Sequence, residues 1–337
     1  MATIKDIAQE AGVSITTVSN VIHGTKSRVS PETVARVQDI IKKNHYRPNM
    51  SARSLVSGNS RIVALINHIE QDDDVSLPGD TFFSQFIRVL EHELSRRQYY
   101  LMIKTARTEE DLLAIYNNWN LAGIIIYGIL EGDFFRQLRK HSFPCILIDS
   151  YIKRNPFHNV GLEDRRGAYM ATEYLIKRGH RHIAFVSPMI YDSGVVHERF
   201  AGFCEALADA GIAREEQNVY QVSRLDMGFM LGHKLAERTD ITAIFATADL
   251  LALGIMAGLQ RCGVRIPDEK SVIGFDDIFG SSLFNPPLTT IRQDIRKRGS
   301  TAVETLIAII EGKKTPKNNI LPVEIVERAS VRDLSSL

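Results

Sequence analysis

At 337 residues the chain is longer than a single hydrophobic core usually allows, so we expect more than one domain. Hydrophobic residues make up 44% and charged residues 24%, as in ordinary soluble proteins, and no apolar run approaches the roughly 20 residues that span a bilayer. The net charge is only +1, but residues 1–61 carry nine lysines and arginines against four acidic residues, which leaves a net charge of −4 for the remainder. A basic N-terminal segment followed by a mildly acidic remainder fits a small N-terminal domain that binds a polyanion.

The three cysteines, Cys145, Cys204 and Cys262, are far apart and form no CxxC pair. We expect each of them to be a small, buried apolar residue and not part of a disulfide or a metal site. The N-terminus also lacks the basic and then apolar layout of a signal peptide. These features predict a cytoplasmic protein without a membrane partner, and they argue against a secreted solute-binding protein.

Two short helices at the start of the chain have the spacing of a helix-turn-helix. Thr3 is the expected N-cap of a helix that Gly12 ends, and Ser14 begins a second helix over residues 15–22 after three intervening residues. A third helix begins at Ser30 and Pro31 and runs to about residue 44. Residues 1–47 are therefore predicted to form an all-α domain.

The outward positions of the second helix carry small or amide side chains, namely Ile15, Thr16, Thr17, Ser19 and Asn20. Such side chains have room to enter the major groove of DNA. The same spacing also fits a three-helix cap whose outer face meets only water. From the spacing alone, neither interpretation is preferred.

Short motifs decide between the two interpretations. In order, they are Ile4-Lys5-Asp6-Ile7-Ala8, Ala11-Gly12-Val13-Ser14, Thr17-Val18-Ser19, Arg28-Val29-Ser30 and Tyr46-Arg47-Pro48-Asn49. Their order and spacing resemble the lactose-repressor and purine-repressor (LacI/GalR) family of bacterial transcription regulators. The resemblance implies that double-stranded operator DNA is contacted by Thr3, Ser14, Ile15, Thr16, Thr17, Asn20, His23, Arg28, Asn49, Ala52 and Leu55. Family members commonly carry Arg where this chain has Asn20, and the loop at residues 23–27 is one residue longer than expected, so the operator sequence is not predicted.

Residues 48–60 are predicted to be a hinge. Pro48 pre-sets a helix start, residues 49–55 are long enough for two turns, and residues 57–60 have the composition of a flexible joint. So short a helix does not hold in water alone. The resemblance implies that it becomes helical on operator DNA, pairs with a second copy in the minor groove, and inserts Leu55 as a wedge. The alternative is a passive linker whose Leu55 packs on the body.

Strand and helix patterns alternate along residues 61–337. The predicted strands are Ile62–Ile66, Tyr100–Lys104, Gly123–Tyr127, Cys145–Ile148, His182–Val186, Ala243–Ala246 and Val272–Phe275. The predicted helices are Phe82–Arg97, Gly167–Arg178, Glu198–Ala210, Gly228–Arg238, Leu250–Cys262 and Lys297–Glu311. This alternation is typical of parallel sheets covered on both faces, and the number of strands favours two lobes.

The family resemblance extends over almost the whole body, for example at Arg199-Phe200-Ala201-Gly202-Phe203, Gly274-Phe275-Asp276-Asp277 and residues 287–293. It implies an α/β, two-lobed fold similar to periplasmic binding proteins, used for effector binding and dimerisation. We place one lobe at about 61–160 and 291–320, and the other at about 161–288 and 321–330. Three crossovers are expected near residues 158–162, 287–293 and 318–324.

Ligands of parallel α/β sheets sit beyond the carboxyl ends of the strands. Asn67, Asp149, Asp249 and Asp276 each follow a predicted strand. The resemblance implies an effector site made of Asn67, Phe83, Asp149, Arg199, Asp276 and Gln293. Other interpretations stay open: Asp249 fits the N-cap of the next helix, Asp277 fits a similar cap, and Arg199 with Asp276 fits a salt bridge between loops.

Two features depart from the family pattern. Ala248 stands where a polar residue usually faces the ligand, which removes one hydrogen bond. Residues 70–80 form a long and acidic loop, which is either a solvated insertion or a lid that disfavours anionic ligands.

We find no constellation for catalysis and expect no cofactor and no metal. His180 and His182 stand two apart at a predicted helix-to-strand turn, and we do not expect them to share a metal. The predicted function is a homodimeric transcription regulator, a repressor, whose operator affinity is controlled by a small-molecule effector such as a sugar. The rival is a ligand-binding protein or a sugar-processing enzyme with an incidental helical head. The head, hinge and two-lobed body occurring together in one chain favour the regulator.

Overall fold

The computed structural model describes residues 2–22, 29–46, 60–68 and 81–335. The chain divides into a head, Met1–Ser60, and a body, Arg61–Leu337. Within the described residues, no helix is long and apolar enough to cross a membrane.

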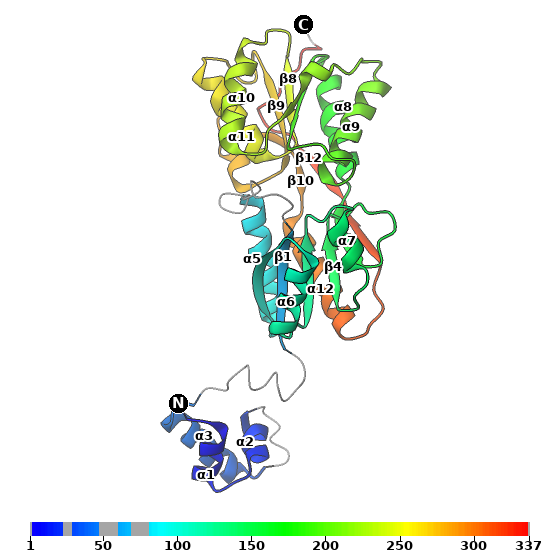
Figure 1. Ribbon diagram of the computed structural model, residues 1–337. Coiled ribbons are helices and arrows are strands. Elements are labelled where there is room, and N and C mark those ends of the chain that lie inside the picture. The colour runs from blue at the N-terminus through cyan, green and yellow to red at the C-terminus, as the bar shows by residue number, and fades with distance from the viewer. Residues whose placement is uncertain (1, 23–28, 47–59, 69–80, 336–337) are drawn as a thin grey trace. The chain divides into compact units, whose positions relative to one another are not determined.

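The described residues of the head form three helices, α1 (Ile4–Ala11), α2 (Ile15–Ile22) and α3 (Pro31–Lys43), at the positions predicted from the sequence (Figure 1). Their apolar faces meet in a small core of Ile7, Ala8, Ala11, Val18, Val21, Val34 and Val37. The Glu10 carboxylate of α1 accepts hydrogen bonds from Lys43 Nζ at 2.7 Å and from the side-chain amide of Asn44 at 2.8 Å. An ion pair therefore also joins α1 to the end of α3.

The described part of the body forms two six-stranded sheets. The first has the order β11-β5-β4-β3-β1-β2 and is parallel throughout. Its strands are β1 (Ile62–His68), β2 (Tyr100–Ala106), β3 (Gly123–Tyr127), β4 (Cys145–Ile148), β5 (His158–Leu162) and β11 (Asn318–Leu321).

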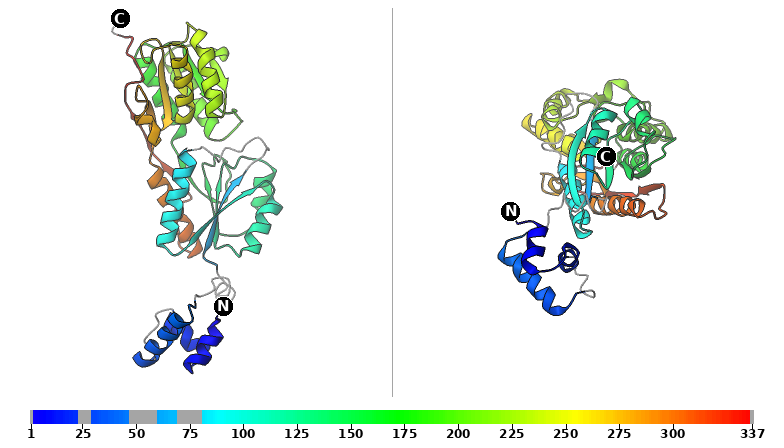
Figure 2. Two further views of the ribbon diagram at one scale, coloured as in Figure 1. Left: turned by 90° about the vertical axis from the view of Figure 1, so that its left-hand side faces the viewer. Right: turned by 60° about the horizontal axis from the view of Figure 1, so that its bottom comes forward.

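Helices cover both faces of the first sheet, as Figure 2 shows. Val63, Leu65 and Ile125 face the core shared with α5 (Thr81–Arg96) and α12 (Ile295–Ile310). The alternate residues, such as Ala64 and Ile124, face the core shared with α6 (Glu109–Asn118) and α7 (Asp133–Leu138). Burial on both sides explains why these strands are almost continuously apolar in sequence.

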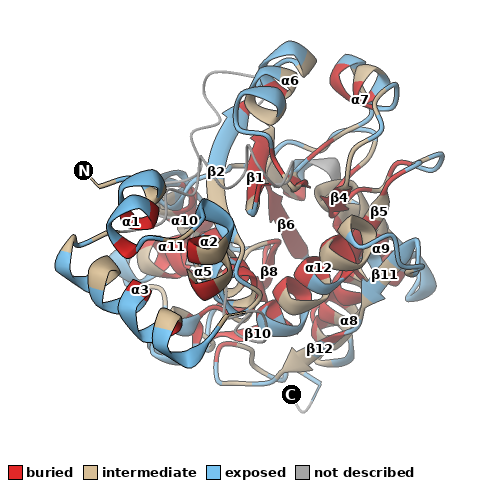
Figure 3. Ribbon diagram, turned by 90° about the horizontal axis from the view of Figure 1, so that it is seen from below, coloured by how far each residue is buried: buried red, intermediate tan, exposed pale blue. Residues whose placement is uncertain are grey.

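The second sheet has the order β12-β10-β9-β8-β6-β7, with only β12 antiparallel to its neighbour. Its strands are β6 (Ile183–Ser187), β7 (Val219–Gln221), β8 (Ala243–Ala246), β9 (Ser271–Asp276), β10 (Thr289–Gln293) and β12 (Val323–Val326). One face packs on α8 (Asp164–Lys177) and α9 (Val195–Asp209), and the other on α10 (Leu225–Glu237) and α11 (Asp249–Arg261). Figure 3 shows the buried residues concentrated on the strands and on the inner helix faces. Short 3₁₀ helices lie at Glu216–Asn218 and Phe279–Ser282.

The chain passes between the sheets three times. It leaves the first sheet after β5, returns to it through α12 and β11, and then enters the second sheet again at β12. These passages place the carboxyl ends of β5 and β10 at the boundary of the two lobes.

The predicted fold class is confirmed: a helical head precedes a body of two parallel-dominated sheets. The seven predicted strands and six predicted body helices are all present, with ends that shift by a few residues. The prediction that all three cysteines are buried holds for Cys145 but is wrong for Cys204, which is half-buried, and for Cys262, which is exposed at the end of α11. The prediction did not identify α6, α7 or β7 as elements. It assigned residues 158–162, 287–293 and 318–324 only to crossovers, and these segments form β5, β10, β11 and β12.

Candidate nucleic-acid interface and ligand site

Thr3 closes the amino end of α1 with a capping box. Its hydroxyl accepts a hydrogen bond from the Asp6 amide, and the Asp6 carboxylate accepts one from the Thr3 amide at 2.8 Å. Hydrogen bonding to Thr3 lowers the pKa of Asp6. Asp6 therefore satisfies amide groups at this helix end, where its negative charge also favours the helix dipole.

The turn between α1 and α2 is fixed by two residues. Gly12 adopts a φ of 64° and ends α1, a left-handed conformation that glycine adopts without steric cost. Ser14 then accepts a hydrogen bond from the Thr17 amide at 3.1 Å, as an N-cap does, and its hydroxyl also contacts the Thr17 hydroxyl. This turn fixes the direction of α2.

The outward face of α2 is built from small side chains. Ile15 is 45% exposed, Thr16 is exposed, and Asn20 is half-buried. Such a face fits a major groove without steric conflict and offers one amide for base contact. Of the predicted DNA contacts, His23, Arg28, Asn49, Ala52 and Leu55 lie outside the described residues.

In the body, the six predicted effector residues are divided between the two lobes, with three residues in each. All six are buried. In the first lobe, Asn67 lies in β1, Phe83 in α5 and Asp149 directly after β4. In the second lobe, Arg199 lies in α9, and Asp276 and Gln293 are the last residues of β9 and β10. Asn67 lies within β1, opposite Thr105 and Tyr127, and not after the strand as predicted. Phe83 packs against the Tyr127 ring, with centroids 5.3 Å apart.

Asp149 forms an ion pair with Arg298 of α12. Arg298 is the largest fully buried side chain in the described structure, and its guanidinium carbon lies 5.3 Å from the Phe82 ring centroid and 5.6 Å from that of Phe86. Burial alone would lower the pKa of Arg298, but the Asp149 charge raises it above its ordinary value. Burial raises the pKa of Asp149 to about 6, against the lowering effect of Arg298.

Gln293 connects this pair to the other lobe. Its amide oxygen accepts a hydrogen bond from Arg298 Nη1 at 2.6 Å, and its amide nitrogen donates to Asp276 Oδ1 at 2.7 Å. Arg298 belongs to a helix that packs on β3, β4 and β5, whereas Asp276 ends β9 of the second sheet. The hydrogen bonds therefore run without interruption from one lobe to the other.

Arg199 is held mainly by Asp164 and only secondarily by Asp276. Its Nε and Nη2 lie 2.8 and 2.7 Å from Asp164 Oδ1, whereas Nη1 lies 3.8 Å from Asp276 Oδ1. The guanidinium also donates to the Thr247 carbonyl oxygen and lies 3.5 Å from the Phe275 ring centroid. Burial would lower the pKa of Arg199, but the neighbouring carboxylates raise it, so it stays charged.

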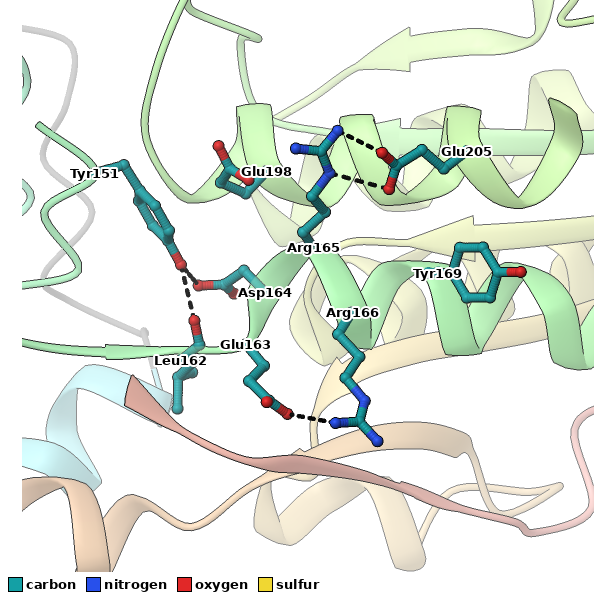
Figure 4. Close-up of a pocket in the computed structure, with 9 residues that line it drawn as sticks. All are labelled: Tyr151, Leu162, Glu163, Asp164, Arg165, Arg166, Tyr169, Glu198 and Glu205. Carbon is teal, nitrogen blue, oxygen red and sulfur yellow. Dashed lines mark hydrogen bonds and ion pairs between the residues drawn. The ribbon is translucent and has the colours of Figure 1, made fainter. Parts of the chain in front are cut away.

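A surface pocket of about 400 Å³ adjoins this network (Figure 4). The Tyr151 hydroxyl points at the Asp164 carboxylate and at the Leu162 carbonyl oxygen, 3.1 Å away, and all three residues line the pocket. The pocket's arginines are already paired, Arg165 with Glu205 and Arg166 with Glu163. Tyr151 and Asp164 thus belong both to the pocket wall and to the buried network.

Backbone conformation directs the aspartates at the strand ends. Asp149, Asp276 and Asp277 have φ values of 57°, 117° and 57°. Positive φ is rare for residues other than glycine, and aspartate is among the few that adopt it. Consecutive positive values turn Asp276 and Asp277 apart, so that Asp276 meets Gln293 while Asp277 pairs with Arg292 and Arg328.

Four buried polar atoms near the network have no hydrogen-bond partner among the described residues. They are Asp149 Oδ1, Ser150 Oγ, Thr247 Oγ1 and Arg298 Nε. Buried polar atoms without partners are costly, and in proteins they commonly mark a place that a ligand or water completes.

Two predictions about aspartates need correction. Asp249 is not an N-cap: Ala248 holds that position without a side-chain bond, and Asp249 is the first residue of α11. Its fully buried carboxylate instead accepts hydrogen bonds from the Ile278 amide and from the Ser281 and Thr290 hydroxyls, and burial raises its pKa to about 7. Asp277 does not cap the following turn in the described structure: Ile278 holds the N-cap position of the 3₁₀ helix without a side-chain bond, and the Asp277 carboxylate pairs with Arg292 and Arg328.

Sequence reasoning missed Asp164, Tyr151 and Arg298. A signal for Arg298 exists, because it stands on the buried stripe of α12 among Ile295, Ala302 and Leu306 as a lone charge. Asp164 follows β5, which the prediction had assigned to a crossover. Tyr151 lies in an irregular loop and has no sequence signal.

Comparison with known proteins agrees with this architecture. Residues 3–49 match the family of bacterial regulatory proteins, lacI family, and residues 172–331 match a periplasmic binding protein-like domain. The chain is 32% identical to the HTH-type transcriptional repressor PurR of Vibrio atlanticus over 344 residues, covering 99% of this chain and all of that protein.

Solved structures show the same similarity. The lac repressor dimer bound to operator and the anti-inducer ONPF has a TM-score of 0.85 at 26% identity, covering 98% of this chain and 99% of that one. The complex of the transcriptional regulator CelR with cellobiose has a TM-score of 0.72 at 27% identity, covering 98% of this chain and all of that one.

Proposed function

Since this chain belongs to the lacI family of bacterial regulatory proteins, and is therefore a DNA-binding transcription regulator, we propose that its inter-lobe network is the effector site that controls operator binding. The observation that carries this proposal is a buried chain of hydrogen bonds that joins both sheets, together with four buried polar atoms that have no partner among the described residues. A site built in this way responds to a ligand by changing the contacts between the lobes.

In the head, the proposed base-reading residues are Ile15, Thr16 and Asn20, because they occupy the outward face of α2. Thr3, Ser14 and Thr17 stand at helix amino ends, where backbone amides and hydroxyls suit phosphate contacts. Neutralising phosphates releases counterions, so operator affinity should fall steeply with salt. An enzyme with an incidental head would instead show turnover and little salt dependence.

In the body, Arg199 and Asp276 are the proposed primary contacts of the effector, with Asp149 and Gln293 beside them and Asn67 and Phe83 at the edge of the site. Closely placed arginine and carboxylate groups match a ligand with several hydroxyls, which donate and accept at once. The complex of the related CelR holds cellobiose, which supports a carbohydrate as the effector class.

We further propose a cytoplasmic homodimer that acts as a repressor. The related lac repressor is bound to its operator as a dimer, and PurR is a repressor. Residues 47–59 lie outside the described residues, and for the segment 48–60 we retain the hinge hypothesis, with Leu55 as a minor-groove wedge. Effector binding would then change the separation of the two hinges and, with it, operator affinity.

The experiment is a thermal-shift screen of a metabolite panel on the full chain, followed by operator binding with every stabilising compound. A ligand at 100 times its dissociation constant adds about 2.7 kcal/mol to stability. We expect a stabilising compound to change operator affinity. Catalytic turnover of that compound, with operator affinity unaffected, would overturn the proposal in favour of an enzyme.

A further inference from the structure

Arg298 is a charged residue on the buried face of α12, where apolar residues are usual. It occupies the apolar stripe of α12 and is 1% exposed, and a desolvated guanidinium is tolerated only with paired partners. Arg298 has two, Asp149 on one side and Gln293 on the other, while the rings of Phe82 and Phe86 complete its surroundings. Gln293 and Asp149 accept hydrogen bonds from Nη1 and Nη2 of the guanidinium, respectively, and neither of them contacts Nε.

The ion pair is incomplete in a specific way. Arg298 Nε, a donor, and Asp149 Oδ1, an acceptor, are both buried without a partner among the described residues. Ser150 Oγ follows Asp149 in the chain and is also without a partner. The pair therefore presents one unused donor and one unused acceptor on two side chains that are already in contact.

We propose that Arg298 is a ligand-binding and specificity-determining residue, whose Nε forms with Asp149 Oδ1 a donor–acceptor pair for two adjacent hydroxyls of a neutral ligand. This rests on the proposed function, because it places the pair inside the effector site. One ligand hydroxyl donates to Asp149, and its neighbour accepts from Arg298. Serine and threonine hydroxyls nearby can complete the remaining hydrogen bonds in either direction.

The charges around the pair exclude the two ionic classes of ligand. A ligand carboxylate would accept from Arg298 but would meet Asp149, and Asp164 and Asp276 add two more buried carboxylates against one further cation, Arg199. A ligand ammonium would bind Asp149 but would meet Arg298 and has no lone pair for Nε. Only a neutral group serves both atoms without bringing like charges together.

The competing explanation is that Arg298 is purely structural. A small rotation would let Nε bind Oδ1 and close a bidentate pair, with no part in ligand binding. The two explanations differ in what a substitution does to ligand discrimination, because a structural residue changes stability without changing which ligand is preferred.

The test uses the full chain and a panel of neutral mono- and disaccharides, each with its deoxy, uronate and amino counterpart, in calorimetric titrations. We expect a neutral member to bind the wild type, and loss of one hydroxyl of the bound pair to weaken binding about tenfold or more. Arg298→Lys keeps a cation but not Nε, so it should weaken the parent sugar by a similar factor and remove the preference over the deoxy form. The control is Arg292→Lys, at a surface arginine paired with Asp277 and Glu324, which should bind as the wild type does.

The melting temperature of each variant without ligand separates folding from binding. The proposal is overturned if Arg298→Lys keeps the wild-type preference for the parent over the deoxy form, while the proposed function stands because the sugar still binds. It is also overturned if the wild type binds only uronate or amino members, or no member of the panel. Failure of the proposed function would show separately, as operator binding that no bound compound alters.

Discussion

Arg199→Met should destabilise the body strongly, and for a reason that is separate from ligand binding. Arg199 and Asp164 are 93% and 99% buried, and Arg199 holds the carboxylate through Nε and Nη2. Methionine keeps the packing on Phe275 but removes the charge. Among the described residues, the Asp164 carboxylate then keeps the hydrogen bond from the Tyr151 hydroxyl, but it loses its counterion while it stays buried.

Breaking a buried ion pair from one side costs roughly 3–5 kcal/mol, because an uncompensated charge stays behind. For a domain of this size, each kcal/mol lost from the free energy of unfolding lowers the melting temperature by a few degrees. The melting temperature of Arg199→Met should therefore fall by roughly 5–15 °C. The double variant Arg199→Met with Asp164→Asn removes both charges. Its loss should be smaller than the sum of the two single losses by roughly 1–3 kcal/mol.

Urea unfolding of the full chain, followed by circular dichroism, measures all three free energies. A single-variant loss below about 1 kcal/mol, or strictly additive losses, would refute the reasoning. Either result would mean that Arg199 is hydrated or bound elsewhere, and that the Asp164 contact contributes little.

Three further predictions follow from single residues. Burial raises the pKa of Asp249 to about 7, so between about pH 4 and 7 this carboxyl is protonated in the folded state but ionised in the unfolded state. The stability of the wild type relative to Asp249→Asn should therefore fall by a few kcal/mol as the pH rises through that window. A stability difference in urea unfolding that does not change with pH would contradict this. Gly202→Ala places a Cβ against the backbone carbonyl group of Arg165, which would push α8 and α9 apart and lower the stability by about 1–3 kcal/mol. Gly280→Ala is the control, because its Cβ would make only an ordinary van der Waals contact. Equal melting temperatures of the two variants would refute this prediction. Asn20→Arg should change the operator recovered by binding-site selection, with about 1–3 kcal/mol lost at the altered base pair, and identical recovered sites would show that Asn20 reads no base.

The predictability of the fold differed between its central and boundary strands. The central strands were predicted because burial on both faces makes them continuously apolar, as in Ile124–Ile126. β5 and β10, which end at the lobe boundary, carry buried polar residues that interrupt the apolar pattern: Asn159 accepts a hydrogen bond from the Ser150 amide next to Asp149, and Gln293 belongs to the network itself. Whether such a segment pairs in a sheet depends on tertiary contacts that no local pattern contains.

The site was predicted in its outline but not in its connections. Asp149, Arg199, Asp276 and Gln293 were named from the family resemblance, and the structure brings them into one network. Their main partners, Asp164 and Arg298, come from a strand end and a helix far along the chain. The role of Asp249 was wrong because its three donors come from residues 278–290, whereas an N-cap is a local interaction.

The central claim is that a ligand in the inter-lobe network controls operator binding, and Asp276→Asn tests it most directly. Operator affinity is measured by fluorescence anisotropy with and without a stabilising compound. For the wild type, the compound should change the dissociation constant roughly 5- to 150-fold, as coupling free energies of 1–3 kcal/mol produce. Asp276→Asn should bind operator as the wild type does without the compound, and it should lose the response. An unchanged response in the variant, at unchanged affinity for the compound, would contradict the account.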